Sequence, residues 1–361
     1  MKDGKIAWGV IGFGNIGPHH AKGVTNAPSA TLAAICDIDP KREEAARKAG
    51  CTAPFYTSMQ AMFKNHPELD AVSVCTYSGI HHEAAVAAAK RGLHVLSEKP
   101  LDVTLAHMDR MIEACEKAKV KLGCIFQRRT TQDSILAKKA MDKKLLGKMV
   151  LGDCYQKYYR SPAYYKSAGW RGTWKLDGGG ALMNQGVHGL DQLLWLMGDV
   201  ESVFSYSATL VRDIEVEDTS VAVVRFKNGA FGNLVTTTSV VPSQGARVSL
   251  HGEKGSITIG DGPMKCQIGR LVKGVHQVEE VDLAAKFKMK SVAPKTTGNV
   301  SSDAKAVTSD GHTIQIEDMC QAILKDRQPM VPGREARKAV ELILAIYKSW
   351  KTGKEVKLPL K

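Results

Sequence analysis

The N-terminal part of the chain reads Ile6-Ala7-Trp8-Gly9-Val10-Ile11-Gly12-Phe13-Gly14-Asn15-Ile16-Gly17. A short apolar strand pattern leads directly into a Gly-x-Gly-x-x-Gly motif and then into a helical pattern, the context that a dinucleotide-binding βα unit requires. Gly12 permits the tight turn, Gly14 lets the backbone approach a pyrophosphate, and Gly17 lets the helix pack closely on the sheet. The helix N-terminus supplies donors and positive potential for the phosphates. We therefore expect cofactor contacts from the loop residues Gly12, Phe13, Gly14, Asn15 and Ile16.

An acidic residue at the end of the next expected strand bears on the choice of cofactor. Asp37 lies 20 residues after Gly17. A carboxylate at this place accepts hydrogen bonds from the adenosine ribose hydroxyls and repels a 2′-phosphate. No Lys or Arg follows until Lys41 and Arg42. The sequence therefore predicts NAD, and not NADP, as the cofactor.

Residues 1–126 alternate short apolar runs with helical patterns, which is typical of a parallel sheet with crossover helices. Strands are expected at residues 6–11, 31–36, 71–75, 94–97 and 121–126. We interpret this region as an NAD-binding Rossmann domain of the α/β class, with a doubly wound parallel sheet. Thr76 follows one of these strands at the ligand-binding edge, so Thr76 and His81 are expected to face the cofactor. The alternative for His81 is a place in the start of a helix.

Residues 127–361 follow a different pattern. The runs at 202–210, 219–226, 230–240 and 246–251 have strand composition and no helix between them, which predicts a large, mostly antiparallel sheet. A further strand is expected at 150–159, helices at 133–143, 181–197, 316–325 and 335–352, and a long loop at 284–312. We expect this second α/β domain to bind the substrate. Because one face of such a sheet needs cover, we also expect a homodimer or homotetramer.

A lysine follows the strand expected at 94–97, in the sequence Glu98-Lys99-Pro100. It lies at the carboxyl end of a central strand, beside a proline whose fixed φ and missing N–H hold the turn in place. An ammonium group there stabilises a developing alkoxide or carries its proton. We therefore expect Lys99 to be catalytic and to contact substrate and cofactor, the alternative being a solvated surface lysine. We also expect Glu98 and Gln127 to contact the cofactor.

A histidine in the helix expected at 181–197 is the second catalytic candidate. Asn184 and His188 are four residues apart and share one helix face, and Asp191 reaches the same side. The ordinary pKa of an imidazole lies near neutrality, which suits a base that removes a hydroxyl proton as hydride leaves the carbon. We predict His188 as this base and Asn184 as a substrate contact; a buried structural histidine is the alternative.

Aromatic and cationic side chains crowd the segment just before that helix: Tyr158, Arg160, Tyr164, Tyr165, Trp170, Arg171 and Trp174. Aromatic faces stack on sugar rings, and arginine binds carboxylate or phosphate through two parallel hydrogen bonds. This composition suits a carbohydrate site, with a packing patch between domains as the alternative. Arg160 and Gln185 therefore join the candidates for substrate contact.

These motifs in this order resemble the Gfo/Idh/MocA family, which includes glucose-fructose oxidoreductase and inositol dehydrogenase. The resemblance rests on the glycine-rich motif, the segment at residues 92–101, the Gly-Gly-x-Leu and Gly-x-His-x-x-Asp segments within 179–191, and the C-terminal segment at 345–360. It covers essentially the whole chain. In motif the chain is most similar to members that oxidise the 3-hydroxyl of nucleotide-linked sugar acids or of glycosides.

The resemblance also implies roles for single residues. It implies that Lys99 works near the nicotinamide, that Trp170 and Arg171 lie close to the cofactor, and that Trp174 lies close to the substrate. Many family members carry Asp where this chain has Asn184. Because Asn holds no negative charge, Asn184 would orient substrate hydroxyls and would not tune a base.

Composition excludes several other classes of protein. The formal net charge is +13, but the lysines are spread along the chain without a nucleic-acid-binding motif, so a solvated basic surface, or steering of an anionic substrate, explains the charge better. The eight cysteines lack metal-binding spacing, so we expect reduced thiols and no metal. No segment approaches the roughly 20 apolar residues that span a bilayer, and the strand at 6–11 leaves no room for a signal peptide. We therefore expect a cytoplasmic protein without a membrane partner.

Together these features predict an NAD-dependent oxidoreductase that transfers a hydride between the nicotinamide and a secondary alcohol of a sugar, glycoside, nucleotide sugar or cyclitol. Two alternatives use the same scaffold. One is a redox-cycling glycoside hydrolase or isomerase with no net oxidation. The other is a non-catalytic cofactor-sensing regulator, which would be expected to lose the lysine or the histidine.

Overall fold

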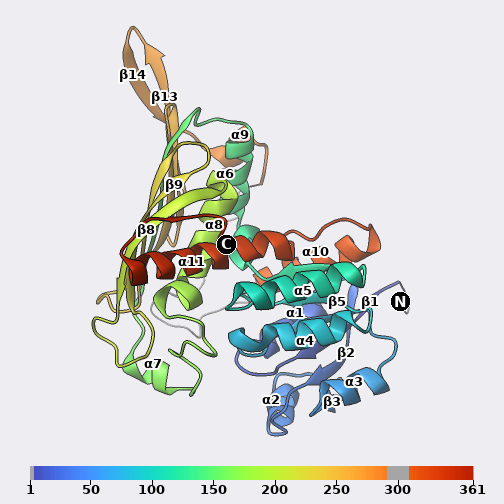
Figure 1. Cartoon of the computed structure of the whole chain (residues 1–361). Helices are drawn as coiled ribbons and strands as arrows, with labels where there is room; N and C mark the ends of the chain where they lie inside the picture. Colours follow the sequence, from blue (N-terminus) through green and yellow to red (C-terminus); the bar gives the residue numbers. More distant parts are fainter. Residues whose placement is uncertain (1–3, 291–308, 361) are drawn as a thin grey trace. The chain divides into compact units, whose positions relative to one another are not determined.

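The computed structural model describes residues 4–290 and 309–360 (Figure 1). Contacts within the chain divide it into two compact units. Among the described residues, the first unit holds 4–127 and 309–340, and the second holds 128–290 and 341–360. The long helix α11 (Gly333–Thr352) contributes to both, because the division falls after Val340.

The first unit contains a parallel sheet of six strands in the order β3-β2-β1-β4-β5-β6. The strands are β1 (Ile6–Ile11), β2 (Ala30–Cys36), β3 (Phe55–Tyr56), β4 (Ala71–Val74), β5 (His94–Ser97) and β6 (Leu122–Cys124). All five expected strands are present, and the two-residue edge strand β3 is added. The strand order reverses between β1 and β4, which is the doubly wound arrangement of the predicted Rossmann domain.

Six helices besides α11 belong to this unit: α1 (Gly17–Asn26), α2 (Arg42–Lys48), α3 (Met59–Asn65), α4 (His81–Ala89), α5 (Leu105–Lys117) and α10 (Asp310–Leu324). Helix α1 lies beside α10, and α4 lies beside α5. The core between α1, α10 and the sheet includes Trp8, Phe13, Ile35, Ile316 and Met319, all fully buried.

Residues 309–340 belong to the first unit, although the sequence predicted a second domain that begins at 127 and runs to the C-terminus. The physical reason is α10. Its apolar residues share a core with α1 and β1, and Glu317 accepts hydrogen bonds from the Ser29 amide and hydroxyl at 3.0 and 2.8 Å. The chain thus returns to the first unit late in the sequence, which a single boundary does not capture.

The prediction of a loop at 284–312 is wrong at both ends of that range, where the structure has helices. Helix α9 (Leu283–Lys286) begins there with Asp282 as its N-cap, and α10 begins at Asp310. Residues 291–308 lie outside the described residues. A short helix with few apolar positions gives little periodic signal, which explains why the sequence did not predict α9.

The second unit contains a sheet of nine strands in the order β14-β13-β12-β11-β7-β10-β9-β8-β15. They are β7 (Met149–Lys157), β8 (Val200–Ala208), β9 (Thr219–Phe226), β10 (Phe231–Thr237), β11 (Gly245–Gly252), β12 (Gly255–Gly260), β13 (Lys265–Val272), β14 (Val275–Glu280) and β15 (Val356–Lys357). Only the pair of β7 and β10 is parallel, which confirms the mostly antiparallel sheet. The sequence did not predict the polar hairpin of β13 and β14, which extends beyond the neighbouring strands (Figure 1).

The two faces of this sheet differ. Helix α8 (Val187–Met197) packs on β7 and β11, and α6 (Gln132–Asp142) packs on α8 and β12. The short helix α7 (Pro162–Lys166) lies in the aromatic segment that follows β7. The face opposite α8 leaves apolar side chains exposed: Tyr206, Val221, Val223 and Phe231.

A π-helical turn, Ala181–Gly186, precedes α8. The single helix expected at 181–197 therefore has two parts with different helical periods. Such turns occur mostly as single insertions within α-helices and are frequent at functional sites. Here the turn holds Asn184 and Gln185, and His188 is the second residue after it.

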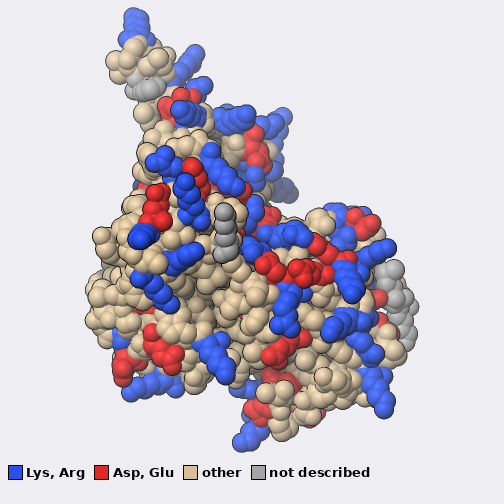
Figure 2. Space-filling model, viewed as in Figure 1, with Lys and Arg blue, Asp and Glu red and all other residues tan. Residues whose placement is uncertain are grey.

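The surface shown in Figure 2 carries Lys and Arg interspersed with Asp and Glu, and no single cationic stripe is visible on this face. This distribution agrees with a solvated basic surface. None of the helices in the described ranges combines the length and the apolar character needed to cross a membrane.

Candidate active site

The glycine-rich loop between β1 and α1 has the backbone that its motif predicts. Gly12 has a φ of +93°, and a Cβ there would lie 2.5 Å from the Cys75 carbonyl oxygen. A Cβ on Gly17 would lie 2.6 Å from the Gly12 carbonyl oxygen, whereas one on Gly14 would meet no atom within 4 Å. The fold itself requires glycine at Gly12 and Gly17, and the open space over Gly14 fits a pyrophosphate. Helix α1 also begins without a side-chain cap, which leaves its amides to a ligand.

Asp37 lies where β2 ends and is bound to this loop. Its Oδ2 accepts a hydrogen bond from the Phe13 amide at 2.6 Å, and its Oδ1 accepts one from the Asp39 amide at 2.9 Å. Each oxygen keeps a lone pair for a ribose hydroxyl. The side chain of Phe13 is fully buried, and its backbone amide donates a hydrogen bond to Asp37. This geometry favours a role in the core for Phe13 over the expected cofactor contact.

Thr76 and His81 have different surroundings, although the sequence analysis expected both at the cofactor. The Thr76 hydroxyl is buried and has no hydrogen-bond partner among the described residues, so it suits a ligand. His81 is buried, with Nδ1 2.9 Å from the Pro100 carbonyl oxygen and Nε2 3.1 Å from that of Thr76. The His81 ring thus lies between two carbonyl oxygens and links the segments that follow β4 and β5. This geometry favours the structural role of His81 over the cofactor contact.

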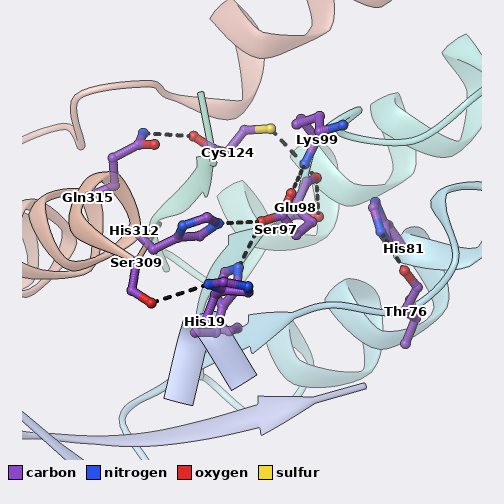
Figure 3. Close-up of polar contacts among 12 residues, drawn as sticks. His19, Thr76, His81, Ser97, Glu98, Lys99, Cys124, Ser309, His312 and Gln315 are labelled. Atoms are coloured by element: carbon purple, nitrogen blue, oxygen red, sulfur yellow. Dashed lines mark hydrogen bonds and ion pairs between the residues drawn. The ribbon is translucent and has the colours of Figure 1, made fainter. Parts of the chain in front are cut away.

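Glu98 holds the turn that carries Lys99 (Figure 3). Its Oε2 accepts a hydrogen bond from the Lys99 amide at 3.0 Å. Its Oε1 accepts two, from His20 Nε2 at 2.9 Å and from His312 Nε2 at 3.1 Å. Figure 3 shows His312 directed at Glu98 from α10. Both Glu98 carboxylate oxygens therefore have hydrogen-bond donors within the protein, which disfavours the expected contact of Glu98 with the cofactor. Lys99 is half-buried just after the end of β5.

Both histidines donate to an ionised carboxylate. Burial alone would raise the pKa of Glu98, but the hydrogen bonds from His20 and His312 hold that pKa well below its usual value. Burial lowers the pKa of His20 and so favours its neutral ring, although Glu98 acts in the opposite direction. His20 Nδ1 lies 2.9 Å from the Ser73 hydroxyl, which leaves Nε2 as the protonated nitrogen that faces Glu98. A buried negative charge thus directly precedes Lys99.

The sequence analysis did not single out His20 or His312. His20 carried a usable signal, because it lies three residues after Gly17 and shares the helix face that packs on the sheet. For His312 the sequence gives no such signal, because it is 214 residues from Glu98 in the chain and falls in the segment expected to be a loop.

In the second unit, the expected substrate residues form one hydrogen-bonded chain. Arg160 donates to Gln185 Oε1 at 3.0 Å, and Gln185 donates to Asn184 Oδ1 at 2.7 Å. Asn184 in turn donates to Asp177 Oδ1 at 2.7 Å, and the other Asp177 oxygen accepts the Gly172 amide at 2.9 Å. Asp177 is buried and orients both amide side chains. The structure therefore brings Arg160, Asn184 and Gln185 together.

Arg171 and Tyr164 lie beside this chain. Arg171 donates to the Tyr164 hydroxyl at 2.6 Å, and Gln185 Nε2 lies 3.4 Å from the same oxygen. The guanidinium carbon of Arg171 is 4.3 Å from the centre of the Tyr164 ring and 4.7 Å from that of Trp170. No carboxylate of the described residues lies within ion-pair distance of Arg171. Among the described residues its guanidinium contacts ring faces and a hydroxyl group, which is an arrangement suited to an anion.

Trp174 makes none of these contacts. Its indole N–H donates to the Glu215 carbonyl oxygen at 3.0 Å, and its ring packs edge-on against Tyr347 at 5.2 Å. The Lys351 ammonium lies over the same ring at 4.8 Å. The structure therefore does not join Trp174 to the group formed by the other expected substrate residues.

His188 lies in the first turn of α8 and is half-buried. The π-helical turn that holds Asn184 ends just before α8, so Asn184 and His188 lie in helical segments of different period. Asp191 forms a buried ion pair with Arg129 at 2.7 and 2.6 Å. Asp191 therefore anchors α8 to Arg129, a partner that the sequence did not indicate.

Two groups of histidine and acidic side chains occur among the described residues: His20 with Glu98 and His312, and His82 with Asp102 and His107. In the second group, both Nδ1 atoms lie 3.0 Å from Asp102, and the rings stack at 3.7 Å with 27° between their planes. Nitrogen lone pairs on nearly parallel rings do not converge on one ion. Hydrogen bonding to a shared carboxylate accounts for both groups.

Comparison with protein families agrees with this architecture. The model described as "Oxidoreductase family, NAD-binding Rossmann fold" (GFO_IDH_MocA) matches residues 6–126, and "Oxidoreductase family, C-terminal alpha/beta domain" matches 138–358. Myo-inositol 2-dehydrogenase of Thermotoga maritima is 34% identical over 257 residues, which cover 69% of this chain and 73% of the relative. The scyllo-inositol 2-dehydrogenase (NAD(+)) of Bacillus subtilis is 22% identical over 366 residues, which cover 99% and 97%.

A solved structure resembles the whole chain. The WlbA dehydrogenase from Bordetella pertussis, in complex with NADH and UDP-GlcNAcA, has a TM-score of 0.82 and 32% sequence identity, and the match covers 99% of this chain and 100% of that one. Levoglucosan dehydrogenase in complex with NADH and levoglucosan, at 22% identity and a TM-score of 0.85, shares the fold. The chain belongs to the Gfo/Idh/MocA oxidoreductase family, and residues 6–126 match the NAD-binding domain of that family.

Proposed function

We propose that the protein is an NAD-dependent dehydrogenase that transfers a hydride between the nicotinamide and a secondary alcohol of a sugar or cyclitol. The observation that carries the proposal is the fixation of Lys99. Glu98 binds the Lys99 amide, His81 Nδ1 is hydrogen-bonded to the adjacent Pro100 carbonyl oxygen, and His312 is hydrogen-bonded to Glu98. A reacting group needs such support, whereas a solvated surface lysine does not. The inositol dehydrogenases among the relatives favour the same class of substrate.

Bound NAD supplies the acceptor for the hydride that leaves the alcohol carbon. We assign His188 as the base that takes the hydroxyl proton, and Lys99 as the donor that stabilises charge on the oxygen. In the reverse direction the same groups return the proton to the oxygen. Arg160, Asn184 and Gln185 orient the other hydroxyls.

Within this class we propose an anionic sugar, such as a nucleotide-linked sugar acid oxidised at its 3-hydroxyl, as the first substrate to test. Arg171 supports this choice, because its guanidinium has no carboxylate partner in the described parts of the chain. The net charge of +13 would steer such a substrate. The relative that is 32% identical was crystallised with UDP-GlcNAcA.

The test begins with the purified protein. It is denatured, and the released NAD(H) is assayed; neutral sugars, cyclitols and sugar acids are then screened by the absorbance of reduced cofactor. A ketone product with stoichiometric NADH supports the dehydrogenase. Isomerised or hydrolysed product without net NADH would favour the redox-cycling alternative, and binding of NAD without any turnover would favour the regulator.

Asp37 is expected to set a preference for NAD over NADP, because its charge repels the 2′-phosphate and its oxygens face the ribose. Asp37→Ser should reduce the ratio of kcat/KM values for NAD and NADP on the order of tenfold or more. Asp39→Asn, two residues on, is the matched control and should leave the ratio unchanged. Preference for NADP in the unmodified protein would contradict the assignment.

The exposed apolar face of the nine-stranded sheet is expected to form a homo-oligomer. Tyr206, Val221, Val223 and Phe231 lie on neighbouring strands and point to the same side. Light scattering at micromolar concentration should therefore show a dimer or tetramer. Val223→Lys should shift it toward monomer, whereas Leu324→Lys, at a partly exposed position of the other unit, should not. A monomer at all concentrations would refute the prediction.

A further inference from the structure

Glu217 is a buried carboxylate just ahead of β9, and its side chain is fully buried (0% exposed). Its Oε2 accepts a hydrogen bond from the Gly180 amide at 2.9 Å, and its Oε1 accepts one from the Leu182 amide at 2.8 Å. Its own carbonyl oxygen accepts the intervening Ala181 amide at 3.0 Å. One residue therefore caps three successive amides where the π-helical turn begins.

Tyr347, from α11, completes this cap. Its hydroxyl lies 3.0 Å from both oxygens of Glu217. A Cβ on Gly180 would lie 1.8 Å from the Glu217 carbonyl oxygen, and one on Gly179 would lie 2.1 Å from the Tyr347 hydroxyl. The two glycines are therefore required by the close approach of Glu217 and Tyr347. This is a physical reason for the glycine run that precedes the turn.

The Glu217 carboxylate has hydrogen bonds but no cation. No Lys, Arg or His of the described residues lies within ion-pair distance of it. The ionisable groups around it are Tyr347 on α11, Asp177 in the loop before the turn, and its neighbour Asp218, which is bound to the amides of residues 210–212. Burial raises the pKa of Glu217 to about 7, although its three donors act in the opposite direction.

We propose that Glu217 is a positioning residue whose ionised form aligns the π-helical turn, and with it Asn184, Gln185 and the following His188. The proposal rests on the proposed function only for the role of these three residues. When Glu217 is ionised, each oxygen accepts one backbone amide at full strength. When it is protonated, one oxygen carries hydrogen, and the amides are unable to reverse their direction. Only the Tyr347 hydroxyl is able to switch from donor to acceptor, so protonation weakens the cap at one amide.

The pH dependence of kcat/KM tests this role in the full-length enzyme with NAD and its best substrate. Tyr347→Phe removes a donor that favours the ionised form while it keeps the ring packed. It should move the acid limb to higher pH by about one unit, the size expected for one hydrogen bond to a charged group. Tyr56→Phe, which removes a hydroxyl bound to His66 in the first unit, is the matched control and should leave the limb in place.

Glu217→Gln gives the second arm, because it offers one acceptor oxygen to two amides at every pH. Its kcat should fall about tenfold, with the KM for NAD unchanged. Hydrogen exchange of residues 180–190 should be faster in this variant, and this readout needs no substrate. Faster exchange without any dehydrogenase activity in the unmodified protein would overturn the proposed function alone. An unmoved acid limb in Tyr347→Phe, or normal exchange in Glu217→Gln, would overturn the positioning role.

Thermal stability should move in the opposite direction to activity. A carboxyl group with a raised pKa in the folded state contributes stability below its unfolded pKa, and this contribution is lost as pH rises through the folded value. The melting temperature should therefore carry a contribution that falls between the unfolded pKa of about 4.3 and the folded pKa of about 7, while kcat rises. Glu217→Gln should remove that contribution. If the unmodified protein and Glu217→Gln showed the same pH dependence, Glu217 would not be the titrating group.

Discussion

Lys99→Met is expected to reduce turnover on the order of 10²-fold or more while NAD still binds. Methionine keeps an unbranched chain of similar length, but it lacks the ammonium donor that stabilises charge on the reacting oxygen. Losses of this size follow the removal of one such donor. Because Glu98 binds the backbone amide of Lys99, which the substitution leaves intact, the turn should keep its conformation.

The measurement is single-turnover and steady-state kinetics with the best substrate, together with NAD binding by titration. Lys90→Met, at an exposed lysine in the same unit, is the matched control and should retain normal turnover and binding. Near-normal turnover in Lys99→Met would show that the site is wrongly assigned, and the regulatory alternative would then gain support. Loss of NAD binding would instead show that Lys99 serves the cofactor.

The fold of the first unit was predictable because its signals are local. Strand β1, the turn at Gly12 and helix α1 are consecutive in the chain, and each depends on residues within a few positions. The sequence did not indicate that residues 309–340 pack with the first unit, because a helix carries no mark of the unit on which it packs. Only the contacts of α10, such as Glu317 with Ser29, determine that.

The sequence indicates the candidate reactive groups of the site, but it does not indicate the residues that hold these groups in place. Lys99 and His188 are candidates because their chemistry and motif positions are visible in the sequence. Their neighbours come from far along the chain: His312 is 214 residues from Glu98, and Tyr347 is 130 residues from Glu217. No periodicity or spacing connects residues at such separations.

The partner of Asp191 was hidden for the same reason. Helical spacing indicates only its neighbours on the helix, whereas its charge is compensated by Arg129, 62 residues earlier. A buried carboxylate binds the nearest suitable cation, and only the tertiary structure shows which one that is. The π-helical turn was likewise invisible, because apolar periodicity over so few residues does not separate an α-helical turn from a π-helical one.

His188→Ala is expected to lower kcat on the order of 10²- to 10⁴-fold, the contribution typical of a general base. His188 lies in the first turn of α8, and alanine keeps the helix, so the loss should fall on the chemical step and spare NAD binding. His251→Ala, at a partly exposed histidine on β11 of the same unit, is the matched control and should have normal kinetics.

The double variant Lys99→Met with His188→Ala then tests whether the two residues act on one proton. Residues that act independently would multiply their losses, whereas residues that serve the same step lose most of the effect with the first substitution. The rate of the double variant should therefore fall far less than the product of the two single losses. A fully multiplicative loss would mean that Lys99 and His188 serve separate steps, and the assignment of His188 as the base for the hydroxyl held by Lys99 would fail.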